Sequence, residues 1–188
     1  MLIPIHQLEE CTNTSLLPRT PGLYFVYHRD SLELEKPVYI GSATGKSGLY
    51  GRIHAQHVNE SYTETRFSKT TKTDAFQVTC NMFNKQGKQY IDKSSLRKAI
   101  GRYHQIAPGK DTAQYIKDNL VFYVLNPSKN QQFKDMAIQL ISSIIPDVDL
   151  DLSTSDTVAS EVMKGAILSV ENLAIGYYQP FYNTQNKA

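Results

Sequence analysis

The chain has 188 residues, of which 20 are basic and 18 acidic, and its two cysteines are Cys11 and Cys80. This length suits one domain with a hydrophobic core, and two distant cysteines are too few for a disulfide framework or a zinc site. No apolar run is long enough to span a membrane, and residues 1–10 lack a secretory signal pattern. We therefore expect a cytoplasmic protein with free thiols and no membrane partner.

The charges are unevenly distributed along the chain. Residues 66–110 contain ten basic and two acidic residues, a net charge of +8, whereas the remainder of the chain sums to −6. A basic segment in an otherwise acidic chain is typical of proteins that bind a polyphosphate such as nucleic acid. The alternative is a solvated surface that is rich in lysine.

Two neighbouring strands are predicted at about 22–28 and 37–41, as a hairpin with a long polar loop. Each strand places a tyrosine, Tyr24 or Tyr39, near a glycine, and the helix that begins near Ser47 carries Arg52. Two phenols and a guanidinium in one such unit suggest chemistry on an anion. The alternative is that both tyrosines are ordinary strand aromatics.

The middle of the chain predicts a strand at 76–82 with a turn at 84–87, a basic helix that opens at Ser94, and a short helix near 111–118. The apolar run at 120–125 predicts a third, buried strand, and residues 133–145 form an amphipathic pattern typical of a helix on a sheet. The last helix is predicted from about 155 to 176. Its buried stripe comprises Val158, Val162, Met163, Ala166, Ile167, Val170 and Leu173.

Glu171 is anomalous in this last helix, because its neighbours three and four residues away are all apolar. They are Ile167, Leu168, Ala174 and Ile175. Burying an unpaired charge costs several kcal/mol, so the carboxylate must find a cation or a strong donor. The alternative is that Glu171 reaches solvent at the edge of the stripe.

Gly22-Leu23-Tyr24 and then Tyr39-Ile40-Gly41, with Arg52 eleven residues after the second glycine, resemble the signature of the GIY-YIG nuclease family. Glu171 followed by Pro180-Phe181-Tyr182-Asn183 is similar to the terminal signature of that family. Leu23 stands where isoleucine is usual. The resemblance covers the two ends of the chain, about a third of its length, and leaves the middle uncovered.

The resemblance implies a single α/β domain over residues 1–188, with a small, mostly antiparallel three-stranded sheet flanked by helices. The basic segment then becomes a DNA-contacting insertion at about 59–119. Within it, we expect the DNA backbone to contact Lys93, Arg97, Lys98 and Arg102.

The family also implies a role for each signature residue. Tyr24, helped by Tyr39, would activate or position the attacking water, and Arg52 would neutralise charge on the phosphorane-like transition state. Glu171 would hold one Mg²⁺ or Mn²⁺ ion that stabilises the leaving 3′ oxygen, and Asn183 would order the site.

Many family members keep a histidine one turn after the arginine, which makes His57 a further catalytic candidate, with His54 as the alternative. Neither has the usual four-residue offset from Arg52, which falls on Gln56. The two histidines have no third ligand nearby, so a zinc site is not predicted.

We expect a metal-dependent DNA endonuclease, similar to the restriction enzymes of this family, in the cytoplasm of a bacterial-type host. One alternative is an antibacterial DNase toxin, secreted into a target cell and paired with an immunity protein. Another is a catalytically silent nucleic-acid-binding module. Cleavage of both DNA strands would be served by a two-fold homodimer, formed in solution or only on DNA.

Overall fold

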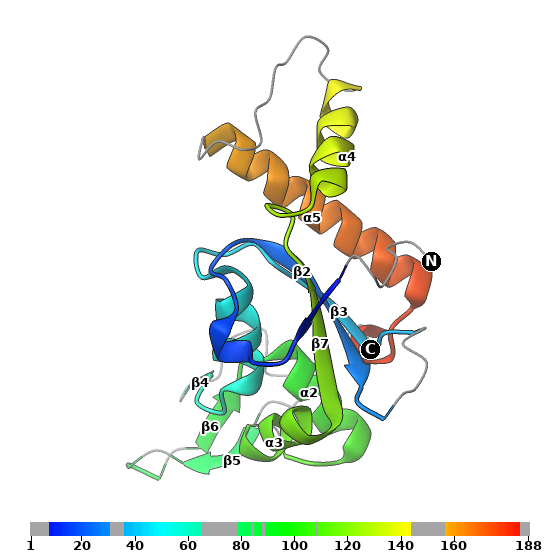
Figure 1. The fold of residues 1–188 in the computed structure, drawn as a ribbon. Helices are drawn as coiled ribbons and strands as arrows, with labels where there is room; N and C mark the ends of the chain where they lie inside the picture. The colour runs from blue at the N-terminus through cyan, green and yellow to red at the C-terminus, as the bar shows by residue number, and fades with distance from the viewer. Residues whose placement is uncertain are drawn as a thin grey trace.

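The computed structural model describes residues 8–30, 36–64, 79–83, 85–87, 89–107, 109–143 and 157–184. Its main feature is a four-stranded antiparallel sheet with the strand order β1-β7-β2-β3 (Figure 1). The strands are β1 (Glu9–Cys11), β2 (Gly22–His28), β3 (Tyr39–Ala43) and β7 (Leu120–Leu125). The prediction of an α/β domain with a mostly antiparallel sheet is therefore confirmed.

The predicted number of strands is wrong, because β1 adds a fourth strand beside β7. Glu9 lies opposite Val124 and Cys11 opposite Phe122 in this antiparallel pair. Strand β1 has only three residues, and the side chains of Glu9 and Glu10 are exposed. A short edge strand of this kind has no apolar alternation, which is the pattern that reveals a strand in a sequence.

One face of the main sheet packs against η3 (Tyr50–Val58), α2 (Ser95–His104) and α3 (Lys110–Asn119), and η2 (Thr14–Leu16) lies against η3. Tyr24, Val26 and Phe122 point to this face because side chains alternate along a strand. The helices contribute fully buried apolar side chains, as predicted for the helix that carries Arg52: Leu49, Ile53, Leu96 and Ile100.

The opposite face packs against α4 (Gln131–Ser142) and α5 (Thr157–Tyr178), which lie beside each other in Figure 1. Helix α6 (Phe181–Thr184) follows α5. The predicted stripe of α5 is buried at Met163, Ala166, Ile167 and Val170. Leu173, however, is 63% exposed, so its assignment to the stripe is wrong. Ala174, fully buried one position later, takes the inward place that follows Val170 by four residues.

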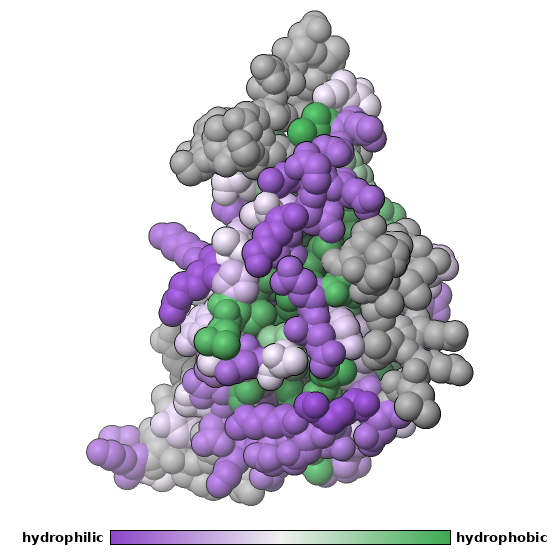
Figure 2. Space-filling view, viewed as in Figure 1, coloured by the Kyte–Doolittle hydropathy of each residue, from purple (hydrophilic) through white to green (hydrophobic). Residues whose placement is uncertain are grey.

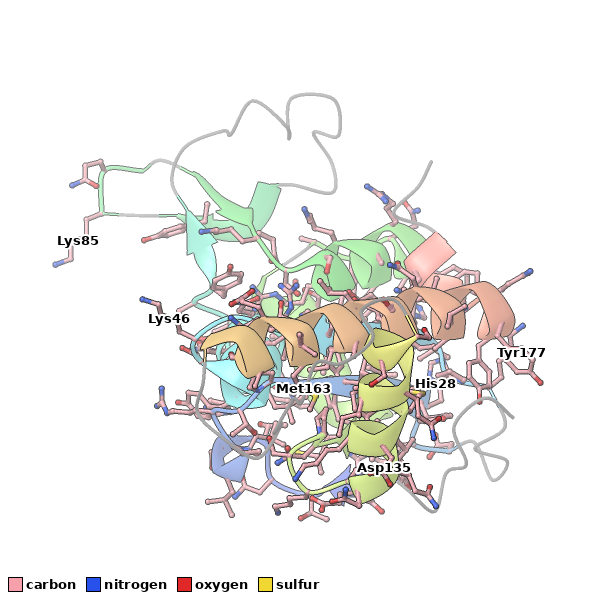
Figure 3. The ribbon with its side chains drawn as sticks, turned by 90° about the horizontal axis from the view of Figure 1, so that it is seen from above. His28, Lys46, Lys85, Asp135, Met163 and Tyr177 are labelled. Atoms are coloured by element: carbon pink, nitrogen blue, oxygen red, sulfur yellow. The ribbon has the colours of Figure 1, made fainter. Side chains whose placement is uncertain are left out.

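A smaller antiparallel sheet has the order β4-β6-β5 and lies within the predicted insertion. Its strands are β4 (Thr63–Glu64), β5 (Thr79–Phe83) and β6 (Gln89–Asp92). The predicted strand at 76–82 corresponds to β5, although residues 76–78 lie outside the described part. Figure 3 shows Lys85 at the far end of the β5–β6 hairpin, projecting away from the body of the molecule.

In the described ranges, no helix is long and apolar enough to cross a membrane. The face of the molecule in Figure 2 carries hydrophilic side chains over α4 and along the edge opposite to it. Hydrophobic side chains come to this surface between those two regions.

Candidate active site at the edge of the sheet

The two glycine–tyrosine triplets meet across strands β2 and β3, where Tyr24 lies opposite Gly41. A Cβ atom on Gly41 would lie 2.2 Å from the Tyr24 hydroxyl, so only glycine leaves room for the phenol. A Cβ on Gly22 would lie 2.7 Å from the carbonyl oxygen of Leu125. The tyrosine of the first triplet therefore packs on the glycine of the second, which explains why the two triplets form one structural unit.

The two phenol rings lie near each other inside the protein. Their centroids are 6.1 Å apart in a stacked arrangement, and Tyr24 is fully buried while Tyr39 is 7% exposed. Burial raises the pKa of Tyr24 well above its usual range, and the neighbouring Tyr39 adds to this rise. Burial also raises the pKa of Tyr39, but a hydrogen bond with Ser95 and the charge of Arg52 oppose that rise. Both phenols are therefore neutral at pH 7.

Helix η3, which carries Arg52 and His57, has π-helical geometry. The backbone N–H of Asn59 donates to the carbonyl of His54, five residues earlier. This backbone hydrogen bond spans five residues, instead of the four that it spans in an α-helix. Within this helix His57, five residues after Arg52, is buried, whereas Gln56, four residues after it, accepts a hydrogen bond from Arg52.

His57 is fully buried and joins Tyr24 to the insertion. Its Nε2 lies 2.7 Å from the Tyr24 hydroxyl, and its Nδ1 lies 2.7 Å from Oγ of Ser94. Burial lowers the pKa of His57 well below its usual range, and the positive charges of Arg52 and Arg97 lower it further. The imidazole is therefore neutral at pH 7 and accepts one hydrogen bond while donating the other. His54 instead contacts Thr14 at 2.9 Å, away from the phenols.

Arg52 lies on the solvent side of the same unit. Its Nε donates to the Ser42 carbonyl over 3.2 Å, and its Nη1 donates to Oε1 of Gln56 over 2.8 Å. Arg52 also lines an open cavity of about 290 Å³ together with Lys46 and the turn at 44–48. Lys46, exposed and labelled in Figure 3, gives this cavity a second positive charge.

Glu171 approaches strand β3 from helix α5, where it is half-buried. The hydroxyl of Ser42 donates to Oε2 of Glu171 over 2.6 Å, so the carboxylate has the strong donor that its apolar neighbours required. Among the residues that the structure describes, no group of three or more His, Cys, Asp or Glu side chains could hold a metal ion. A metal at Glu171 would thus have one protein carboxylate, oriented by Ser42, which suits Mg²⁺ because this ion keeps several waters.

Asn183 and Tyr182 hold the carboxyl end of the chain against β3. The Asn183 amide accepts from the Ile40 N–H over 2.7 Å and donates to the Ile40 carbonyl over 2.8 Å. The backbone N–H of Tyr182 donates to the carbonyl of Val38 over 2.8 Å. Asn183 thus fixes the backbone of the Tyr39-Ile40-Gly41 triplet rather than pointing into the site.

Of the four cationic residues predicted to contact DNA, Arg97 lies in the interior. Its side chain is fully buried, and its Nε lies 2.8 Å from Oδ2 of Asp92. The guanidinium also donates to the carbonyls of Asn59 and Tyr62. Arg97 therefore ties α2 to the end of η3 and offers no group to DNA, which corrects the sequence-based assignment.

The other three cations of this set lie at the surface. Lys93 is exposed, with its ammonium 5.1 Å from the centre of the Tyr62 ring, and Lys98 and Arg102 are half-exposed on α2. A cationic side chain on an aromatic face keeps its charge accessible to a polyanion. These three residues therefore keep the expected surface location.

Sequence reasoning missed three serines of the site: Ser42, Ser94 and Ser95. Ser42 directly follows the second triplet, and Ser94 opens a predicted helix, which is the usual position of a capping residue. Capping explains such a serine by itself, so the sequence held no signal that the hydroxyl also contacts His57.

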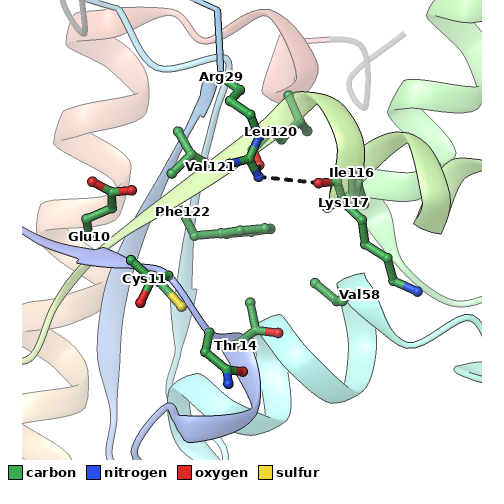
Figure 4. A pocket seen from close by; sticks show the side chains of 12 residues that line it. Glu10, Cys11, Thr14, Arg29, Val58, Ile116, Lys117, Leu120, Val121 and Phe122 are labelled. Carbon is green, nitrogen blue, oxygen red and sulfur yellow. Dashed lines mark hydrogen bonds between the residues drawn. The ribbon is translucent and has the colours of Figure 1, made fainter.

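A separate cavity of about 310 Å³ lies between β1, β7 and the end of α3 (Figure 4). Cys11, Thr14 and Lys117 line it, and Arg29 donates to the Lys117 carbonyl at its wall. None of the predicted site residues lines this cavity, so it is distinct from the candidate active site.

The chain matches no protein-family model, no curated protein and no solved structure in comparisons with each of these sets.

Proposed function

We propose that the chain is a metal-dependent DNA endonuclease of the GIY-YIG type, which hydrolyses phosphodiester bonds without a covalent intermediate. The observation that carries the proposal is the convergence of Tyr24, His57, Arg52 and Glu171 around strand β3. These residues come from both ends of the chain, yet Arg52 and Glu171 both form a hydrogen bond with Ser42 of β3. A packing role would not require charged and titratable groups to meet there.

The inner residues of the site provide a route for one proton. A water molecule that attacks phosphorus must lose a proton, and the Tyr24 hydroxyl is the group that would take it. Because the neutral phenol cannot hold a second proton, Tyr24 passes its own proton to Nε2 of His57, 2.7 Å away. This transfer would leave Tyr24 neutral and His57 charged, and because the pKa of His57 is lowered, the imidazole would release the proton again after cleavage.

The outer residues of the site manage charge. The Arg52 guanidinium, exposed beside the open cavity, would donate to the non-bridging oxygens as negative charge develops on phosphorus. Glu171, held by Ser42, would bind the divalent cation, which supplies charge neutralisation at the leaving 3′ oxygen. Lys46 adds positive charge to the same cavity and would hold a neighbouring phosphate of the strand.

Cleavage of supercoiled plasmid across a Mg²⁺ titration tests the proposal. Wild type should nick or linearise the plasmid, and Glu171→Gln should show no Mg²⁺-dependent cleavage because it lacks the anionic ligand. Glu161→Gln is the matched control, since Glu161 lies on the same helix but pairs with Lys164 at the surface. Circular dichroism should show that all three proteins are folded. Cleavage by Glu171→Gln at the wild-type rate would refute the site.

We also propose a restriction role, which the size distribution of the DNA fragments tests. A restriction-type enzyme should convert long DNA into discrete fragments, because it cuts at one sequence. A DNA-degrading toxin should instead produce a continuous smear from the same substrate.

A further inference from the structure

We infer that helix α2 of the insertion belongs to the catalytic unit, with Ser94 and Ser95 at its start as the positioning residues of Tyr24 and Tyr39. Ser94 acts through His57, which it holds with the proton on Nδ1, and Ser95 acts on Tyr39 directly. The inference rests on the proposed function, and it assigns to the insertion a part in the chemistry beside its part in DNA binding.

The first step is that the two serines reach the two phenols from adjacent positions. Oγ of Ser94 lies 2.7 Å from Nδ1 of His57, whose Nε2 contacts Tyr24, and Oγ of Ser95 lies 2.9 Å from the Tyr39 hydroxyl. Ser94 is 1% exposed, so water does not compete for its hydroxyl. One helix end thus controls the hydrogen bonding of both tyrosines.

The second step concerns the direction of the hydrogen bonds at His57. Ser94 is the N-cap of α2, and its Oγ accepts from the backbone N–H of Arg97 over 3.2 Å. The second lone pair of this oxygen is then available for an Nδ1–H donor. With its proton on Nδ1, His57 presents the Nε2 lone pair to Tyr24, which donates its hydroxyl hydrogen.

The third step is that a buried ion pair fixes this arrangement. Asp92 accepts from the backbone N–H of Ser94 over 2.7 Å and pairs with Arg97. Arg97 in turn donates to the carbonyls of Asn59, which directly follows η3, and of Tyr62, three residues later. The Asp92–Arg97 pair therefore joins the start of α2 to the end of η3 and keeps Ser94 at hydrogen-bonding distance from His57.

The test uses three variants that separate helix capping from positioning. Ser94→Gly keeps most of the capping stability but removes the hydroxyl from His57. Ser94→Thr keeps the hydroxyl and should restore the wild-type behaviour. Ser95→Ala removes the hydrogen bond to Tyr39.

The first readout is the tautomer of His57, from long-range ¹H–¹⁵N correlation of the histidine rings, with the signals assigned through His57→Gln. Wild type and Ser94→Thr should carry the proton on Nδ1, and Ser94→Gly should show a mixture of both tautomers. A wild-type proton on Nε2, or an unchanged tautomer in Ser94→Gly, would overturn the inference.

The second readout is plasmid cleavage. Ser94→Gly and Ser95→Ala should lower kcat by about 10- to 100-fold with KM for DNA unchanged, as is usual when a positioning hydrogen bond is removed. A wild-type kcat in Ser94→Gly would overturn the inference while leaving the proposed nuclease intact. If wild type itself does not cleave DNA, the proposed function fails, and the histidine tautomer still decides whether Ser94 positions His57.

Discussion

The candidate site beside strand β3 has two halves that differ in their access to water. The inner half contains Tyr24, His57 and Ser94, which are at most 1% exposed and uncharged. The outer half contains Arg52, exposed, and Glu171, half-buried, both of them charged. Burying an unpaired charge costs far more than burying a hydrogen-bonded neutral group, which fits the contact that Arg52 and Glu171 keep with water. Under the proposed function, the inner half would transfer the proton and the outer half would stabilise charge.

The largest effect should come from breaking the inner half. Tyr24→Phe keeps the ring over Gly41 but removes the hydroxyl, so plasmid cleavage should fall by about 10²- to 10⁴-fold. Tyr27→Phe is the control, because Tyr27 is equally part of β2 and 5% exposed but packs on the opposite face. Equal cleavage by the two variants would mean that Tyr24 serves packing alone.

Removing the cation of the outer half, Arg52, should lower DNA cleavage almost as strongly. Arg52→Ala removes the charge expected beside the transition state and should lower kcat by about 10²- to 10³-fold. Gln56→Ala removes only the partner that accepts from Arg52 and should cleave nearly as well as wild type. Single-turnover cleavage measures both variants, and comparable reductions in the two would place the critical interaction at Gln56.

The burial of the inner half should also affect how the stability of the protein depends on pH. The pKa of His57 is lowered in the folded protein, so below about pH 6.5 the unfolded chain binds a proton that the folded chain does not. The free energy of unfolding should therefore fall with decreasing pH, by up to about 1.4 kcal/mol per pH unit for this group. The stability that His57 contributes is complete above that pH.

Urea unfolding of wild type and His57→Gln at about pH 7.5, 6.5 and 5.5 measures this dependence. The variant should lose part of the slope on the acid side. Burial lowers the pKa of His104 as well, which gives a contribution of the same sign in both proteins. Identical slopes for the two proteins would contradict the burial of a neutral imidazole at position 57.

The smallest effect concerns the surface of the insertion, outside both halves. Replacing Lys93, Lys98 and Arg102 with glutamine should weaken DNA binding and reduce its salt dependence, by about 0.9 in logarithmic slope for each phosphate that is no longer neutralised. Replacing Lys129 and Lys134 with glutamine is the control, because these lysines lie outside the insertion, before and on α4. Fluorescence anisotropy at several salt concentrations tests this prediction, and an unchanged slope would remove the insertion from the DNA interface.

The sequence predicted the parts of the fold that carry a periodic signal. The apolar runs at β2, β3 and β7 and the amphipathic patterns at α4 and α5 were sufficient to locate these elements. Strand β1 gave no signal, because its pairing with β7 uses backbone groups that every sequence has. The exposure of Leu173 was also missed, since the helical pattern alone does not show where the sheet stops covering α5.

Site residues with a distinctive chemistry and spacing were predictable from the sequence. Residues whose role depends on the residue that they contact were not. The glycine and tyrosine triplets, Arg52 and Glu171 stood out by chemistry and spacing. His57 was a candidate through the family resemblance alone, because its spacing did not show that it contacts both Tyr24 and Ser94. Arg97 was misassigned to the surface, because a charge count does not distinguish a solvated guanidinium from one paired inside the protein with Asp92.

The attachment of Asn183 and Tyr182 to strand β3 limits how two copies of this chain can associate. A strand at the end of a sheet can recruit another chain through its unpaired N–H and C=O groups. Here the amide of Asn183 occupies both backbone groups of Ile40, and Tyr182 occupies the carbonyl of Val38. A continuous sheet running through β3 of two protomers is therefore blocked, so the expected homodimer would have to form through another surface.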